Sequence, residues 1–219
     1  SKVGSLIKQK ANKKCSVLAL RSISCDFHEG DKVGLLGHNG SGKTTLLKVA
    51  SGIYFPTSGK IIKNCNVQPM IYKNYLVNQE LTGADAAKAF YLFIKNNNKG
   101  FRNYFEDIKD FSELGEFINM PIKTYSEGMN ARLQFAMFTG LKHECLVMDE
   151  GFGTGDFKFF EKAQLRLQEF IRSSGLFLLA SHSEEILKQF CTRGIVLKRG
   201  ALVFDGPILD AINFYHEDK

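Results

Sequence analysis

The sequence lacks paired cysteines. Its five cysteines stand singly and form no CxxC pair; they are Cys15, Cys25, Cys65, Cys145 and Cys191. An odd and dispersed set does not suit a disulfide framework or a zinc site, both of which need cysteines at defined spacings. The sequence therefore predicts a protein that works in a reducing compartment.

The sequence also lacks long apolar runs. A helix that crosses a bilayer needs about 20 consecutive apolar residues, and no stretch comes near that length. No secretory leader pattern, internal repeat or long low-complexity tract is visible either. We therefore expect a cytoplasmic chain whose membrane role, if it has one, comes through a partner.

The composition that is present fits an ordinary globular protein. The 219 residues suffice for one sizeable domain, or for a domain that carries a smaller inserted lobe. Hydrophobic residues make up 44% and charged residues 24%. The net charge of +6 could indicate nucleic acid or an anionic membrane surface. Lysines and arginines scattered over solvated faces are the more ordinary explanation, and we favour it.

Hydrophobic patterning predicts alternating strands and helices. Strands are expected at 16–27, 32–37, 144–150 and 175–183, and an edge strand after the turn at 55–58. The helix after 42 should stop at Gly52, and a hairpin should turn at Arg199-Gly200 before a final helix that follows Pro207. This order predicts a mostly parallel sheet with functional residues at the carboxyl ends of its strands.

The segment from Glu80 to Ile122 has a different texture. Residues 82–95 show helical periodicity, with Thr82 as a candidate cap and Asp85 completing a pattern like a capping box. Aromatic residues at helical spacing follow at 101–114. We therefore predict a single domain over 1–219, with an α/β core at 1–79 and 123–219 and a helical insert at about 80–122.

The stretch "GHNGSGKTT" carries the strongest functional signal. It matches the pattern G-x-x-x-x-G-K-[ST], and it stands between a predicted strand and a predicted helix, as a phosphate-binding loop does. Glycines let backbone N–H groups surround phosphates, Lys43 suits the terminal phosphates, and the Thr44 hydroxyl suits Mg²⁺. The loop predicts an NTP site.

Two later strands end in residues of matching chemistry. Asp149, at the end of an apolar strand, would hold Mg²⁺, and Glu150 could orient and deprotonate an attacking water. His182 follows the strand expected beside the Asp149 strand, so its imidazole could reach a γ-phosphate. A solvent-facing acidic pair and a structural histidine are the ordinary alternatives.

The stretch "TYSEGMNARLQFAM", at 124–137, predicts a second helix start suited to an anion. Ser126 and Gly128 leave backbone N–H groups uncovered where the helix dipole also favours negative charge. Ser126 could also be a plain N-cap, and the two roles are compatible.

Together, "GHNGSGKTT", "YSEGM", "LVMDEGFGTGD" and "ASHS" resemble, in this order, the nucleotide-binding subunit of ABC transporters. The resemblance implies a P-loop NTPase fold of the ABC ATPase type, with an antiparallel β subdomain and a helical insert. It also implies ATP and Mg²⁺ as ligands and a homodimer in which each "YSEGM" helix covers the nucleotide of the other subunit.

The resemblance also assigns roles to individual residues. Lys43 would contact the β- and γ-phosphates, Thr44 and Asp149 would hold the metal, Glu150 would be the general base and His182 would sense the γ-phosphate. Asp156 would lie in the loop that links the two sites, and Ser126, Glu127 and Gly128 would cover the opposite ATP. The cradle would consist of Gly37, His38, Asn39, Gly40, Ser41, Gly42, Lys43, Thr44 and Thr45.

Finer features resemble exporters of capsular polysaccharide, O-antigen or teichoic acid, among them "GIYFPTSG", "ELTG" and the tail "G.LVFDGP…AINFY". That likeness implies a membrane permease that docks on the helical insert, and a lipid-linked polysaccharide as cargo. Some O-antigen members add a C-terminal carbohydrate-binding domain, and its absence up to Lys219 favours a capsule or teichoic-acid type.

Two features depart from the family pattern. Residues 1–26 contain no aromatic residue that could stack on adenine, and the loop before the insert has no well-placed glutamine, with Gln68 and Gln79 both candidates.

A soluble ABC-type ATPase acting on nucleic acid or ribosomes is the alternative function. The chain lacks the long coiled coils or second cassette that such proteins carry, so no nucleic acid is expected. A P-loop kinase or GTPase is disfavoured by "YSEGM" and His182.

Overall fold

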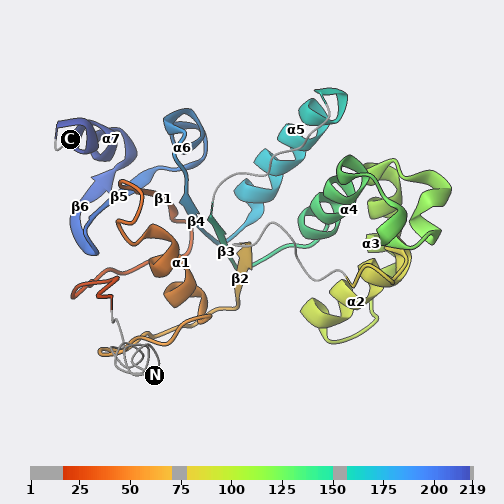
Figure 1. Cartoon of the computed structure of the whole chain (residues 1–219), viewed down its shortest axis with the longest axis horizontal. Helices are drawn as coiled ribbons and strands as arrows, with labels where there is room; N and C mark the ends of the chain where they lie inside the picture. Colours follow the sequence, from red (N-terminus) through yellow and green to blue (C-terminus); the bar gives the residue numbers. More distant parts are fainter. Residues whose placement is uncertain (1–16, 71–77, 150–156, 218–219) are drawn as a thin grey trace, which may run out of the picture.

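The computed structural model describes residues 17–70, 78–149 and 157–217 of the chain, and within these residues it contains one mixed sheet (Figure 1). The strand order is β2-β3-β4-β1-β5-β6. All neighbouring strands are parallel except the hairpin β5–β6. The strands are β1 (Lys32–Leu36), β2 (Val67–Met70), β3 (Cys145–Asp149), β4 (Leu176–Ala180), β5 (Arg193–Lys198) and β6 (Ala201–Pro207).

Helices cover both faces of this sheet. The α-helices are α1 (Lys43–Ser51), α2 (Gly83–Lys95), α3 (Phe101–Ser112), α4 (Glu127–Thr139), α5 (Phe157–Ser173), α6 (Glu184–Phe190) and α7 (Ile208–Glu217). Two short 3₁₀ turns, η1 (Gly115–Asn119) and η2 (Ile122–Thr124), lie between α3 and α4. In the part of the chain described, no helix is both long and apolar enough to cross a membrane.

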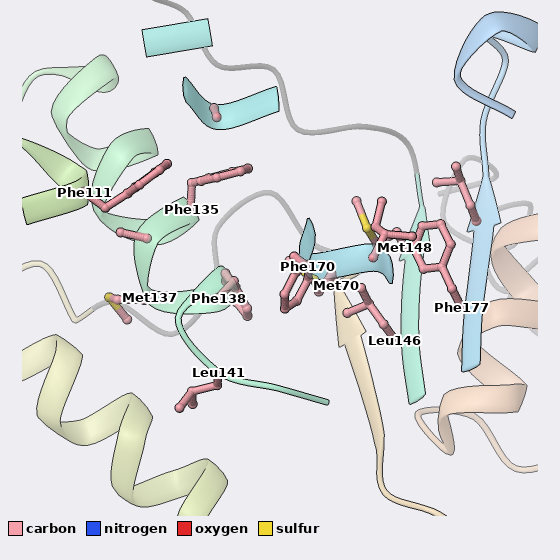
Figure 2. Close-up of a cluster of buried hydrophobic side chains, with 14 of the residues drawn as sticks. Met70, Phe111, Phe135, Met137, Phe138, Leu141, Leu146, Met148, Phe170 and Phe177 are labelled. Carbon is pink, nitrogen blue, oxygen red and sulfur yellow. The ribbon is translucent and has the colours of Figure 1, made fainter. Parts of the chain in front are cut away.

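Alternation along the central strands divides the core in two. In β3, Cys145 and Val147 face a cluster that includes Leu46 and Leu47 of α1. The alternating residues of the same strand, Leu146 and Met148, face the opposite cluster, to which α2, α3, α4, α5 and α7 contribute (Figure 2). Because both faces are covered, the strands are nearly continuous apolar runs, as is usual for parallel sheets.

Most of the predicted elements are confirmed. Gly52 ends α1 in a left-handed conformation, and the hairpin turns at Arg199 and Gly200, both with positive φ. Thr82 caps α2, since its hydroxyl accepts a hydrogen bond from the Asp85 N–H at 3.1 Å. The same hydroxyl donates to the Asp85 carboxylate at 2.7 Å, whereas in a full capping box this carboxylate would accept from the Thr82 backbone N–H.

Two predicted strands are wrong. Residues 17–28 and 59–66 contain no strand. An alternation of apolar and polar residues indicates a segment that is buried on one side. A strand also needs a neighbouring strand that forms hydrogen bonds with it. Val17 is 86% exposed and Ile62 is 73% exposed, so their apolar side chains are not covered either. The antiparallel strand pairing of the described residues is that of β5 with β6.

Two helices were not predicted at all. Helix α5 is amphipathic, with Ala163, Phe170 and Ile171 buried, a pattern that the sequence does contain. Helix α6 has only seven residues and begins at the cap Ser183, whose hydroxyl accepts from the Ile186 N–H. A helix that short covers less than two turns and is shorter than the window of about 11–18 residues in which helical periodicity can be recognised.

Candidate nucleotide site

Residues 37–42 form the turn between β1 and α1. Gly37, Gly40 and Gly42 all have positive φ, at 145°, 77° and 108°. Such angles favour glycine, because a Cβ meets the backbone there. Helix α1 has Gly42 at its N-cap and no capping side chain, so side chains of its own turn do not cover its first N–H groups. The arrangement is that of an anion-binding helix start.

The loop 37–42 packs closely against the hairpin β5–β6 and against the segment around Ala19. A Cβ on Gly37 would lie 2.4 Å from the Leu197 carbonyl oxygen, and a Cβ on Gly42 would lie 2.8 Å from that of Ala19. The Gly200 N–H donates to the Ser41 carbonyl at 2.9 Å. The hairpin β5–β6 and the segment around Ala19 therefore hold the loop in shape. Sequence reasoning missed this support, because no local pattern connects residues so far apart.

Lys43 folds back across the loop. Its ammonium donates to the carbonyl oxygens of Gly37 at 2.6 Å and His38 at 3.2 Å, and the residue is only 8% exposed. A buried ammonium needs acceptors, and these carbonyls supply them. The Lys43 ammonium therefore places a positive charge at the loop 37–42, where it could bind a polyphosphate.

Ser41 supports the same chemistry. It is 5% exposed, and among the described residues its hydroxyl has no hydrogen-bond partner. Buried hydroxyls are normally paired, so an orphaned one in a Gly-rich turn fits a phosphate oxygen as its partner.

The carboxyl ends of three strands meet beside this loop. Ala180 is paired with Leu35 of β1 on one side and with Asp149 of β3 on the other, so the strands end in one row. Asp149 is partly buried and Thr44, in the first turn of α1, is exposed. A hydroxyl and a carboxylate are oxygen donors of the kind that Mg²⁺ takes together with substrate phosphates, so the residues present fit this metal.

Ser181 and His182 continue β4 at the same edge. Ser181 is buried, and its hydroxyl accepts from the Ser183 N–H at 3.1 Å, which shapes the turn into α6. His182 is exposed on this turn. The fold therefore brings His182, Asp149 and the loop 37–42 to one edge of the sheet.

The second predicted anion site lies elsewhere. Ser126 caps α4, since its hydroxyl accepts from the Met129 N–H at 3.2 Å, and Ser126 and Glu127 are both exposed. Figure 1 shows α4 beside α2 and α3, on the far side of the sheet from α1. The fold does not bring Ser126, Glu127 and Gly128 to the loop 37–42 of their own chain.

Some predicted site residues stay untested. Glu150 and Asp156 lie outside the described residues. Gln68 lies within β2, opposite Leu146, rather than in the loop that follows. Gln79 comes after the segment 71–77, and its carbonyl accepts from the Lys123 N–H. Neither glutamine gains support as a nucleotide contact.

One contact at the loop was not foreseen. The ring of Tyr215, in α7, lies 5.2 Å from that of His38, and its hydroxyl is 3.4 Å from the His38 Nδ1. The C-terminal helix therefore touches the second residue of the loop. The final helix was predicted, but nothing in its pattern points to residue 38.

Comparisons with known proteins agree with this arrangement. A sequence model of the ABC transporter family matches residues 20–153. The O-antigen export system ATP-binding protein RfbE of Yersinia enterocolitica is 40% identical over 85% of this chain and 78% of its own. The capsule polysaccharide export ATP-binding protein CtrD of Neisseria meningitidis is 35% identical over 90% of this chain and 89% of its own. The teichoic acids export ATP-binding protein TagH of Staphylococcus haemolyticus is 34% identical over 94% of this chain and 78% of its own.

Solved structures share the fold. An ATP-binding subunit of an ABC transporter superposes with a TM-score of 0.75 at 18% identity, over 90% of this chain and 87% of its own. A dimeric ATP-binding cassette in a post-hydrolysis state, with bound ADP and phosphate, gives a TM-score of 0.68 at 20% identity, over 90% and 94%. At these identities the likeness concerns the fold alone.

Proposed function

The chain belongs to the ABC transporter family as one of its ATP-binding subunits, and on this premise we propose that it hydrolyses ATP to drive the export of a lipid-linked polysaccharide. The proposed cargo rests on one observation. Three relatives, matched over most of their lengths, are named as export proteins for O-antigen, capsule polysaccharide and teichoic acids. The three cargoes share the chemistry of a long cell-surface glycan, so this class is proposed and not one member of it.

In this proposal the loop 37–45 binds the triphosphate. The Lys43 ammonium exchanges its carbonyl partners for oxygens of the β- and γ-phosphates, and the N–H groups of the first turn of α1 hold the same phosphates. Thr44 and Asp149 would hold Mg²⁺, which neutralises charge on the phosphates. Glu150 accepts a proton from the attacking water, and His182 donates a hydrogen bond to the γ-phosphate.

The separation of α4 from the loop 37–42 supports a shared site. Because α4, which begins after the exposed Ser126, lies beside α2 and α3 and not at the loop 37–42, in this proposal Ser126 covers a nucleotide on another chain. We therefore propose a homodimer with two ATP molecules at its interface, docked through its helical inserts on a membrane permease at the cytoplasmic face. The proposed domain has its core at 1–79 and 123–219 and its helical insert at about 80–122. Asp156 is proposed to lie in the loop that links the two sites.

The alternative, a soluble ATPase acting on nucleic acid or ribosomes, rests only on the net charge of +6. The relatives named above are export proteins, and each matches most of this chain, which favours the exporter.

The substitution Glu150→Gln tests the mechanism. Without a base for the water, ATP turnover should fall by at least about 100-fold, while ATP still binds. The variant should then form an ATP-dependent dimer, measured by light scattering coupled to size exclusion. Glu169→Gln, on the exposed face of α5, is the matched control and should leave turnover unchanged. Wild-type turnover by Glu150→Gln would refute the general-base role.

In cells, the same variant should stop the glycan from reaching the surface and leave lipid-linked glycan inside. A genomic neighbourhood that holds a permease gene and glycosyltransferase genes would support the same cargo class. Normal surface glycan in a strain that carries only Glu150→Gln would contradict the export function.

A further inference from the structure

The chain that enters α4 is bound to the chain that enters α2. Residues 121–123 run antiparallel to residues 79–82, with Thr82 and Pro121 forming an isolated β-bridge. Two further backbone bonds join these segments, from the Ile122 N–H to the Leu81 carbonyl at 2.9 Å and from the Lys123 N–H to the Gln79 carbonyl at 3.0 Å. The start of α4 therefore takes its position from the helical insert rather than from the sheet.

Tyr125 adds a side-chain contact to this pairing. Its N–H donates to the Ile122 carbonyl at 2.9 Å, and its hydroxyl donates to the Phe117 carbonyl, in η1, at 2.6 Å. The same hydroxyl lies against Gly83, since a Cβ built there would be 2.5 Å from it. Burial raises the pKa of Tyr125, and the Gly83 backbone partly offsets that rise. One hydroxyl thus joins η1, the first residue of α2 and the residue before Ser126.

Gly83 leaves the space that this hydroxyl occupies. A Cβ on Gly83 would lie 2.5 Å from the Tyr125 hydroxyl oxygen and 3.0 Å from the Ile118 carbonyl oxygen. Any other residue at 83 would therefore push the tyrosine away from its acceptor. Gly83 is the first residue of α2, and the close approach of this hydroxyl gives a physical reason for a glycine at that position.

We propose that Tyr125 is a positioning residue for ATP turnover: its hydroxyl, bonded to Phe117 and packed against Gly83, fixes the direction of the Ser126–Gly128 turn toward the nucleotide of the partner subunit. The inference rests on the shared site proposed above. Ser126 adjoins Tyr125 and is exposed; its hydroxyl accepts from the Met129 N–H at 3.2 Å and its carbonyl accepts from the Asn130 N–H at 3.0 Å, so both of these bonds tie it to α4. Because the two residues are adjacent, a small rotation at 125 moves the Ser126 hydroxyl directly.

The test is Tyr125→Phe, which removes the hydroxyl and keeps the ring. We expect kcat for ATP to fall by about 10-fold, because misplacement of a positioning group by a fraction of an ångström already slows turnover. Nucleotide affinity of the single subunit should not change, since the loop 37–45 is untouched. In the Glu150→Gln background, the ATP-dependent dimer should need about 10-fold more ATP, by the same argument.

Tyr91→Phe is the matched control. Tyr91 belongs to the same insert, and its hydroxyl also donates to a backbone carbonyl, that of Lys99, away from the start of α4. Both variants should lose a similar amount of thermal stability, and only Tyr125→Phe should lower kcat. A purely structural role for Tyr125 would make the two variants behave alike, which would overturn the inference.

Gly83→Ala provides a second, independent variant. It should lower kcat like Tyr125→Phe, because the new Cβ displaces the hydroxyl. Combined with Tyr125→Phe it should lower kcat little further, since the hydroxyl it would strike is gone. Full additivity of the two effects would contradict a common path through the hydroxyl.

Ser126→Arg separates this inference from the function on which it rests. If Ser126→Arg leaves turnover unchanged, the shared site itself is wrong. If Ser126→Arg abolishes turnover while Tyr125→Phe retains wild-type kcat, the shared site stands and only the role of Tyr125 fails.

Discussion

At the scale of single residues, the glycines of the loop 37–42 are not equivalent. Gly42 has φ of 108°, and a Cβ there would meet the Ala19 carbonyl at 2.8 Å and the Leu20 side chain at 3.0 Å. Gly40 has φ of 77°, close to the left-handed region, and a Cβ there would meet nothing within 4 Å. One position is limited by both backbone conformation and space, and the other by conformation alone.

We therefore expect Gly42→Ala to destabilise the nucleotide-free protein more than Gly40→Ala. The left-handed conformation costs an L-residue about 1–2 kcal/mol, and the contact at Ala19 should add about 1–3 kcal/mol at position 42. Urea unfolding without nucleotide measures both free energies of unfolding. Equal losses at the two positions would show that Ala19 does not confine the loop.

At the scale of elements, α2 begins with a cap that is formed entirely by its own residues. The Thr82 hydroxyl and Asp85 exchange two hydrogen bonds, and Asp85 places a negative charge in the first turn, where the helix dipole favours it. Since Thr82 also forms the bridge to Pro121, the cap fixes the end of α2 that lies beside Tyr125.

Thr82→Ala should lower the free energy of unfolding by about 1 kcal/mol, the usual cost of losing a capping hydroxyl. Thr82→Ser keeps a hydroxyl and should recover most of that loss. Thermal or urea denaturation followed by far-UV circular dichroism measures both. Equal stability of Thr82→Ala and the wild type would mean that the bridge to Pro121 alone defines the helix start.

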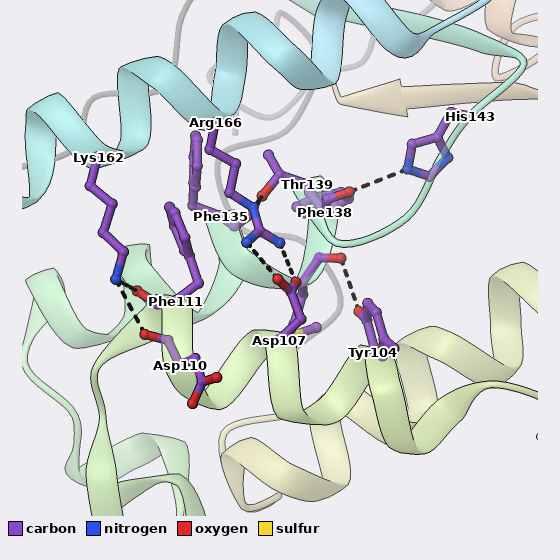
Figure 3. Close-up of polar contacts among 11 residues, drawn as sticks. Tyr104, Asp107, Asp110, Phe111, Phe135, Phe138, Thr139, His143, Lys162 and Arg166 are labelled. Carbon is purple, nitrogen blue, oxygen red and sulfur yellow. Dashed lines mark hydrogen bonds and ion pairs between the residues drawn. The ribbon is translucent and has the colours of Figure 1, made fainter.

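At the scale of the whole molecule, one arginine connects the helical insert to α5. Arg166 makes a two-pronged ion pair with Asp107 of α3, donates from Nε to the Thr139 hydroxyl of α4 at 2.7 Å, and stacks 4.2 Å from the Phe111 ring (Figure 3). Its side chain is only 16% exposed. Three helices thus share one planar cation, whose rigid geometry suits such a junction.

A double-mutant cycle with Arg166→Leu and Asp107→Asn should give a coupling free energy of about 1 kcal/mol. The value is modest because the Asp107 side chain is 45% exposed, so solvent screens the pair. Urea unfolding at low and high salt measures it, and high salt should reduce it. Independent, additive effects of the two substitutions would show that the pair does not tie the insert to α5.

Figure 3 also shows a contact that packs the insert against α4. The buried Tyr104 hydroxyl, in α3, donates to the Met137 carbonyl of α4 at 2.9 Å, and burial raises the pKa of Tyr104 far above its usual range. The proposed cover for the partner's nucleotide is therefore part of a packed group of helices that shares one hydrophobic cluster with the sheet.

Several functional features of this protein can be predicted from short stretches of its sequence. The loop from Gly37 to Thr45, the acid Asp149, the turn at His182 and the cap at Ser126 are short local patterns, and each fixes its own backbone through glycine freedom, capping or strand burial. That is why the α/β order, the ATP site and the family could be predicted from residues adjacent in the chain.

The contacts that support these patterns become visible in the folded chain. The crowding of Gly42 by Ala19, the contact of His38 with Tyr215, and the contacts of Tyr125 with Gly83 and Phe117 join residues that are distant in sequence or that lack any periodic signal. The tertiary structure also decided that 17–28 and 59–66 are not strands, because a strand depends on a neighbour's hydrogen bonds and alternation alone cannot supply one.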